Sequence, residues 1–263
     1  MNNFWRVFKI TFIDVVRSKW NIGFFIFFLG LAFALLHFSD NLSKALISIL
    51  NVVLFIVPLM GAIMGSMYFY NSIDFVDLLL SQPLKRSSVF LGQSMGLSSG
   101  IALAYLLGVG IPFLSFGLME SADIFNFFSL LISGIFLAVI FTAFSYMIAI
   151  FNPDKVRGIG IALLSWLFLS VVYDGLFLIY LMVFSEYPVE KHAIVIALLN
   201  PIDLARIMTM LKLDIAALLG YTGAVFKAFF GSDLGLVLST LAMLFWALFP
   251  FVFITRKGNK RDF

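Results

Sequence analysis

The chain contains no cysteine, which excludes a disulfide framework and a thiolate metal site. Its two histidines, His37 and His192, lie far apart in the sequence, so no convincing Ser/His/Asp set can be built around them. The sequence also lacks the glycine-rich P-loop pattern and the HExxH zinc pattern. We therefore expect a protein that is no enzyme by itself, binds no nucleotide through a P-loop of its own and holds no metal.

Charged residues are scarce, at 12% of 263 residues, whereas a soluble domain has about 25%. Hydrophobic residues make up 62%, phenylalanine alone contributes 33, and the mean hydropathy is +1.09. Apolar runs longer than about 18 residues are typical of transmembrane helices. The sequence therefore predicts an all-α polytopic membrane protein with six transmembrane helices, at 21–38, 45–70, 89–118, 126–150, 158–184 and 233–255.

Lysine and arginine are unevenly shared between the segments that connect these spans. Twelve of the 17 lie in the N-terminal segment, the second and fourth connections and the C-terminal tail. The other five lie in the first and fifth connections, and four of them are in the long fifth one, which counts less. Because positive residues favour the cytoplasm, both termini are predicted to be cytoplasmic.

The first twenty residues interleave aromatic and charged positions. Phe4, Phe8 and Phe12 share one helical face, and Arg6 and Arg17 share the other, a pattern typical of a helix lying on a membrane. A short cytoplasmic tail merged into the first span is the alternative, and no cleavable signal peptide is evident. We predict an interfacial elbow helix at 1–20, a six-span domain at 21–255 with an outer loop at 185–232, and a basic cytoplasmic tail at 256–263.

Asp174, preceded by Tyr173, lies inside the fifth predicted span. A carboxylate near the bilayer centre costs about 2.5–3.5 kcal/mol on insertion scales, so it needs protein, water or a proton as a partner. One hypothesis makes Asp174 a polar gate or proton site. The other makes it part of an interhelical hydrogen bond that fixes packing.

The stretch FVDLLLSQPLKRSSVFLGQ, residues 75–93, is too polar to cross a membrane and too apolar for an ordinary loop. Asn71 is predicted to cap a short helix that ends before Pro83, and Ser87 or Ser88 to cap the third span. This segment could rest on anionic lipid. Its leucine-rich ridge, flanked by acids and bases, also fits a groove on a cytoplasmic partner.

The stretch LLLSQPLKRSSVFLG, residues 78–92, resembles the first cytoplasmic loop of six-span ABC export permeases of the second type. Further stretches resemble the NosY-like permeases, a family linked to copper-site maturation of nitrous-oxide reductase. They are Lys155 followed eleven residues later by Trp166, the run around Asp174, and LLNPIDLARI at 198–207. Gln93 departs from the family, which usually has lysine there.

The resemblance implies an exporter-type permease fold in a bacterial inner membrane, and a homodimer bound to two copies of a separate ATPase, which carries ATP and Mg. It also implies a periplasmic NosD-like partner. The implied ATPase-coupling residues are Asp74, Asp77, Leu78, Leu79, Leu80, Pro83, Lys85, Arg86, Asp154 and Lys155. The implied partner-facing residues are Glu186, Asn200, Pro201, Asp203 and Arg206.

Three alternatives remain open at this point. The substrate of an ABC exporter could be a lipid, a peptide or a drug. The chain could instead be a proton-coupled secondary transporter that uses Asp174, although no internal repeat of the kind such transporters show is convincing. It could also be a membrane anchor that recruits a cytoplasmic protein without transport.

Overall fold

The computed structural model describes residues 3–39, 41–82, 84–117, 123–184, 190–210 and 233–258. Within these ranges every regular element is helical. The first half contains α1 (Asn3–Arg17), α2 (Lys19–Phe38), α3 (Leu42–Asn71), α4 (Ile73–Leu80), α5 (Arg86–Ser115) and α6 (Ile124–Phe151). The second half contains α7 (Lys155–Leu167), the π-helix η2 (Phe168–Val172), α8 (Tyr173–Val183), α9 (Glu190–Leu198), α10 (Pro201–Met210) and α12 (Asp233–Gly258).

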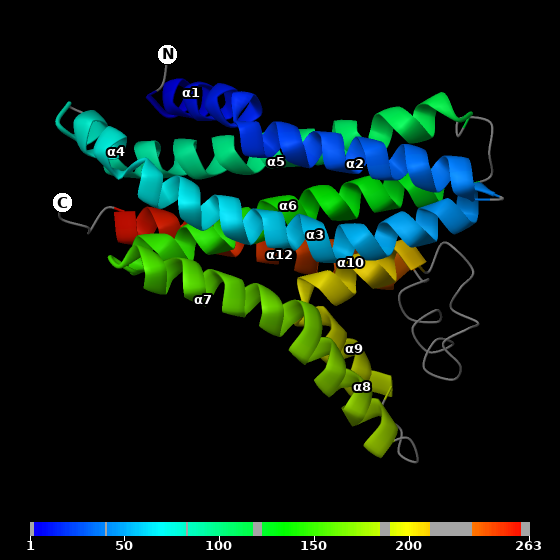
Figure 1. Ribbon diagram of the computed structural model, residues 1–263. Helices are drawn as coiled ribbons and strands as arrows, with labels where there is room; N and C mark the ends of the chain where they lie inside the picture. The colour runs from blue at the N-terminus through cyan, green and yellow to red at the C-terminus, as the bar shows by residue number, and fades with distance from the viewer. Residues whose placement is uncertain are drawn as a thin grey trace.

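Six of these helices are long and apolar enough to cross a membrane, which confirms the predicted fold class. They are α2, α3, α5, α6, the continuous helix α7–η2–α8, and the part of α12 from Val237 to Gly258. The beginning of α1, helix α4 and the end of α12 lie at one end of the bundle (Figure 1), hereafter the α4 end. Residues 211–232 of the predicted outer loop lie outside the described residues.

Small residues allow the spans to approach one another closely. On α3, a Cβ atom added to Gly65 would lie 2.0 Å from Ser145 Oγ and 2.4 Å from the Thr142 carbonyl oxygen of α6. Ser145 also donates a hydrogen bond to the Gly61 carbonyl, at 2.9 Å. Because apolar helices gain little by leaving lipid for each other, such backbone contacts and hydrogen bonds are what hold the α3–α6 pair together.

Helix α1 lies along α5 rather than apart from the bundle (Figure 1). A Cβ atom at Gly92 or Gly96 of α5 would come within 3 Å of the carbonyl oxygens of Phe4 and Phe8. The buried positions of α1 are Val7, Thr11 and Val15. Phe4, Phe8 and Phe12, predicted to share the apolar face, are only half-buried, because α1 approaches the glycines of α5 too closely for large side chains to lie between the two helices. Their rings stack on one another along α1.

The fifth span is the one least embedded in the bundle. Only 11% of its most apolar window is buried, compared with 67% for α5. Figure 1 shows α8 and α9 diverging from the other helices beyond the π-helix η2. Helices α9 and α10 bend by 109° at the break between Leu198 and Pro201, so α10 returns toward the bundle, where it packs on α6.

Candidate functional site at the α4 end and its polar connections

Helix α4 is a short amphipathic helix just beyond the end of α3. Val76 is buried and anchors it, whereas Asp74, Asp77 and Leu78 are exposed. Asp74 lies in its first turn, where a carboxylate favours the positive end of the helix dipole. Leu79 and Leu80 are half-buried, and Pro83 lies outside the described residues. The structure thus confirms a short helix in this segment.

The predicted caps around α4 are wrong. Asn71 is the last residue of α3. Ser72 is the residue before α4, and its side chain makes no capping hydrogen bond to the backbone of α4. The residue before α5 is Lys85 rather than a serine, and Arg86 opens the helix. A single residue, Ser72, separates α3 from α4, so Asn71 still belongs to α3 and does not take the non-helical backbone geometry of a helix cap.

A second turn, at 152–157, contacts the end of α3, which leads into α4. Asp154 caps α7 by accepting hydrogen bonds from the backbone nitrogens of Val156 and Arg157, at 2.8 and 3.1 Å. Lys155 donates from Nζ to Asn71 Oδ1 at 2.9 Å. The Tyr70 hydroxyl lies 2.9 Å from the Asn152 carbonyl oxygen and 3.2 Å from that of Asp154. Residues 71–82 and 152–157 are therefore joined into one unit, hereafter the coupling platform.

A buried polar chain links the coupling platform to the spans. Gln93 of α5 is 1% exposed. Its Nε2 donates to Ser72 Oγ at 2.8 Å, and its Oε1 accepts from the Tyr146 hydroxyl of α6 at 2.5 Å. A buried amide with both ends bonded is stable, whereas one that loses a partner is costly. Sequence reasoning singled out Gln93 only as a departure from lysine and missed this role.

At the opposite end, a cluster of polar side chains fastens the fifth span to α10. Arg206 donates from one guanidinium nitrogen to both carboxylate oxygens of Asp174, at 2.9 and 3.0 Å. The same nitrogen lies 3.4 Å from Asp203 Oδ1. Asp174 therefore forms an interhelical ion pair, which is close to the packing hypothesis, with a charged partner that the sequence did not identify.

The π-helix contributes to this attachment. Asn200 donates from Nδ2 to the Leu169 carbonyl in η2 at 2.9 Å and to Asp203 Oδ2 at 3.0 Å. Tyr173 donates to the Ile196 carbonyl at 2.6 Å. π-Helical turns often occur at functional sites, because they present backbone groups differently from an α-helix. Here the presented carbonyl accepts the amide of Asn200.

Three residues expected to face a partner lie inside the fold. Asn200, Pro201 and Asp203 are buried, and Asn200 and Asp203 bond within the cluster just described. Their side chains do not form a free surface, because they satisfy one another and the π-helix. Glu186 lies outside the described residues.

No protein-family model matches the chain. It is 26% identical, over 231 residues, to the "Probable ABC transporter permease protein NosY" of Stutzerimonas stutzeri, which covers 80% of this chain and 82% of that protein. It is also 26% identical over 266 residues to the protein of the same name from Pseudomonas aeruginosa, covering 92% and 93%. The resemblance seen in the sequence is thus confirmed: the chain is similar to NosY-type ABC-transporter permeases along most of its length.

Proposed function

We propose that this chain is the membrane subunit of an ABC complex in which a separate ATPase docks on the coupling platform. The single observation that carries the proposal is the exposure of apolar side chains at the α4 end of the bundle. Leu78 is 60% exposed in α4, and Val156 is 82% exposed at the start of α7. The start of α7 is hydrogen-bonded to Asn71 at the end of α3, two residues before α4 begins. Exposed apolar residues that are rimmed by charges mark interaction sites.

The charges around these side chains suit a protein partner. Asp74 and Asp77 lie on α4. Lys85 follows α4 closely in sequence, and Lys155 is hydrogen-bonded to Asn71, just before α4. Asp154 is engaged in capping α7, so its contribution to docking is to shape the second turn rather than to contact the partner directly. The ATPase would carry ATP and Mg, and this chain would supply no catalytic group.

Movement would pass from the coupling platform to the far end through the spans. The Gln93 contacts couple Ser72, the residue before α4, to α5 and α6, and Tyr70 couples the end of α3 to the start of α7. Along the fifth span, the Asp174–Arg206 pair then connects to α10. ATP-driven closure of the ATPase would in this way reposition α9 and α10, where a periplasmic NosD-like partner would bind.

The resemblance to NosY-like permeases supports the remaining parts of the proposal. They are a homodimer with two ATPase copies, a bacterial inner membrane with both termini in the cytoplasm, and a role in assembling the copper site of nitrous-oxide reductase. Copper is here the cargo or end product of the complex, not a cofactor of this chain.

The test is the rate of ATP hydrolysis by an ABC ATPase that co-purifies with this chain, reconstituted with the chain in liposomes. Leu78→Asp is expected to reduce stimulation by the permease at least tenfold, because a charge enters the apolar contact. Phe116→Asp is the matched control: Phe116 is 44% exposed just past α5, at the opposite end. Equal stimulation by Leu78→Asp and wild type would contradict the proposed docking site.

The copper role needs a separate measurement. Cells that lack this chain should make nitrous-oxide reductase with an incomplete copper complement, and the wild-type chain should restore it. A full copper complement without the chain would remove this part of the proposal and leave the ABC permease assignment untouched.

A further inference from the structure

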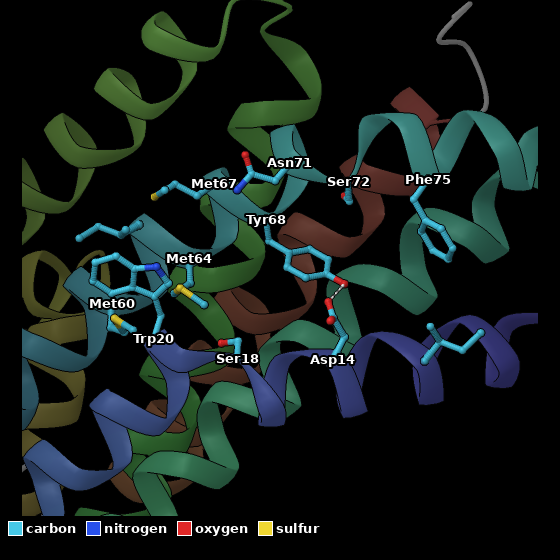
Figure 2. Close-up of a pocket in the computed structure, with 12 residues that line it drawn as sticks. Asp14, Ser18, Trp20, Met60, Met64, Met67, Tyr68, Asn71, Ser72 and Phe75 are labelled. Carbon is cyan, nitrogen blue, oxygen red and sulfur yellow. Dashed lines mark hydrogen bonds between the residues drawn. The ribbon is translucent and has the colours of Figure 1, made fainter.

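A cleft of about 580 Å³ opens between α1 and α2 on one side and α3 and α4 on the other (Figure 2). This volume is within the range of small-molecule sites, about 300–1,000 Å³. Neither the coupling platform nor the Asp174 cluster explains it. Ser72 and Phe75 line it, so its occupant would touch the start of α4.

The cleft changes from apolar to polar along α3. Met60, Ile63 and Met64 line its part nearer the middle of the span, together with Trp20 of α2. Tyr68, Asn71 and Ser72 line the part near the α4 end. The eleven steps along the helix from Met60 to Asn71 correspond to about 16 Å at a rise of 1.5 Å per residue. A molecule with an apolar tail and a polar head fits this gradient, with the head at the α4 end.

The polar part carries a single charge. Among the residues that line the cleft, only Asp14 is ionisable as an acid or a base at neutral pH, and its Oδ2 accepts a hydrogen bond from the Tyr68 hydroxyl at 3.0 Å (Figure 2). That neutral donor leaves the carboxylate charge uncompensated. Ser18, also in the lining, is flanked in sequence by Arg17 and Lys19, both exposed. One acid therefore lies in the lining, and two exposed bases are the sequence neighbours of a lining residue.

We propose that this cleft binds a membrane lipid with a zwitterionic headgroup that ends in a primary ammonium, such as phosphatidylethanolamine. The ammonium would lie at Asp14 and Tyr68, and the phosphate near Arg17 and Lys19. Methionine side chains adapt to irregular apolar shapes, which suits an acyl chain. Tryptophan and tyrosine, here Trp20 and Tyr68, are enriched at sites with one apolar end and one end exposed to water, and their rings attract cations.

The charge pattern selects against an anionic headgroup. A phosphatidylglycerol in the same position would bring no cation to Asp14, and its headgroup would leave the carboxylate without an opposite charge. An exposed charge pair contributes roughly 0.2–1 kcal/mol, which corresponds to a preference of up to about fivefold. In this proposal Asp14 recognises the lipid by its ammonium group, and the acyl tail contributes the part of the affinity that is the same for every lipid.

Native mass spectrometry of the detergent-purified chain tests the proposal directly, without an ATPase. Dioctanoyl phosphatidylethanolamine and dioctanoyl phosphatidylglycerol are titrated separately, so that tails are equal and only headgroups differ. We expect the ethanolamine lipid to bind the wild type about three- to fivefold more tightly. Asp14→Asn should remove that preference, whereas Asp77→Asn, an exposed acid outside the cleft, should retain it.

A second variant tests the tail region independently. Ile63→Trp fills the apolar part of the cleft and should weaken both lipids at least threefold, whereas Leu114→Trp, on an exposed position of α5, should not. Equal binding of both lipids by the wild type, or an unchanged preference in Asp14→Asn, would overturn the proposal. So would a second copy of the chain that displaces the lipid as protein concentration rises, since the cleft would then be a protein contact.

Discussion

Lys155 donates a hydrogen bond from its ammonium nitrogen to Oδ1 of Asn71, at 2.9 Å, across 84 positions of sequence. This contact joins the end of α3 to the start of α7 and makes two short turns into one surface. Tyr70 reinforces the junction, since its hydroxyl lies among the carbonyl oxygens of the second turn. A partner that binds either turn therefore acts on α3 and α7 together.

Replacing Lys155 with Met keeps the length of the side chain and removes the donor to Asn71. Both residues are exposed, so the loss of stability should be less than about 1 kcal/mol. Stimulation of the ATPase should nevertheless fall several-fold, because the second turn is no longer held to the end of α3. The pair of readouts is the melting temperature in detergent and the hydrolysis rate in liposomes. A large melting shift with full stimulation would contradict the joined surface.

Replacing Gln93 with Leu removes the buried amide between Ser72 and Tyr146. The two hydroxyls lose a partner in a buried site, so we expect a cost of about 1–3 kcal/mol. Tyr146→Phe should cost a similar amount, and the double variant less than the sum, because the two residues share one bond. Gln82→Leu, on an exposed position, is the control and should melt like the wild type. Additive losses would show that the bond contributes nothing.

Replacing Arg206 with Ala leaves Asp174 without its cation. The arginine and aspartate side chains are 31% and 27% exposed, so solvent reduces the penalty to about 1–2 kcal/mol rather than the 3–5 of a fully buried pair. Asp174→Asn keeps a hydrogen-bond acceptor and should cost less. Thermal melting measures both. If Asp174→Asn instead abolished a proton-dependent transport activity in liposomes without any ATPase, the secondary-transporter hypothesis would return.

Replacing Gly65 with Ala pushes α3 away from α6. The new Cβ would meet Ser145 Oγ at 2.0 Å and a backbone oxygen at 2.4 Å, and overpacking of this kind typically costs 1–3 kcal/mol. Gly30→Ala in α2 has nothing within 4 Å and should be neutral or slightly stabilising. Melting temperatures of the two variants, compared side by side, check the contrast. Equal melting would mean that the two helices are not in close contact.

The spans and the short helix α4 could be predicted from sequence because long apolar runs and a charged interruption are local signals. The predicted caps at Asn71 and at Ser87 or Ser88 were wrong, because local sequence signals do not locate a helix boundary to within one residue. The predicted end of the third span at 118 lies beyond Ser115, where α5 stops.

The candidate sites were harder to predict. Asp174 was conspicuous in an apolar run, but its partner Arg206 lies 32 residues away on a helix that folds back by 109°. Asn200 and Asp203 look like surface residues in sequence. In the buried site, Asn200 donates to the π-helix carbonyl of Leu169, and Asp203 is bonded to Asn200 and Arg206. The role of Gln93 depends on three helices that meet in space, and no local pattern encodes that meeting.

The measurement that tests the central claim most directly is site-specific cross-linking to the ATPase. The chain has no cysteine, so Leu78→Cys or Phe116→Cys introduces a unique thiol on an otherwise unreactive background. With a short thiol-reactive photo-cross-linker in membranes, the account predicts a covalent adduct with the ATPase from Leu78→Cys and none from Phe116→Cys. An adduct from Phe116→Cys alone, or a chain that purifies without any ATPase, would contradict it.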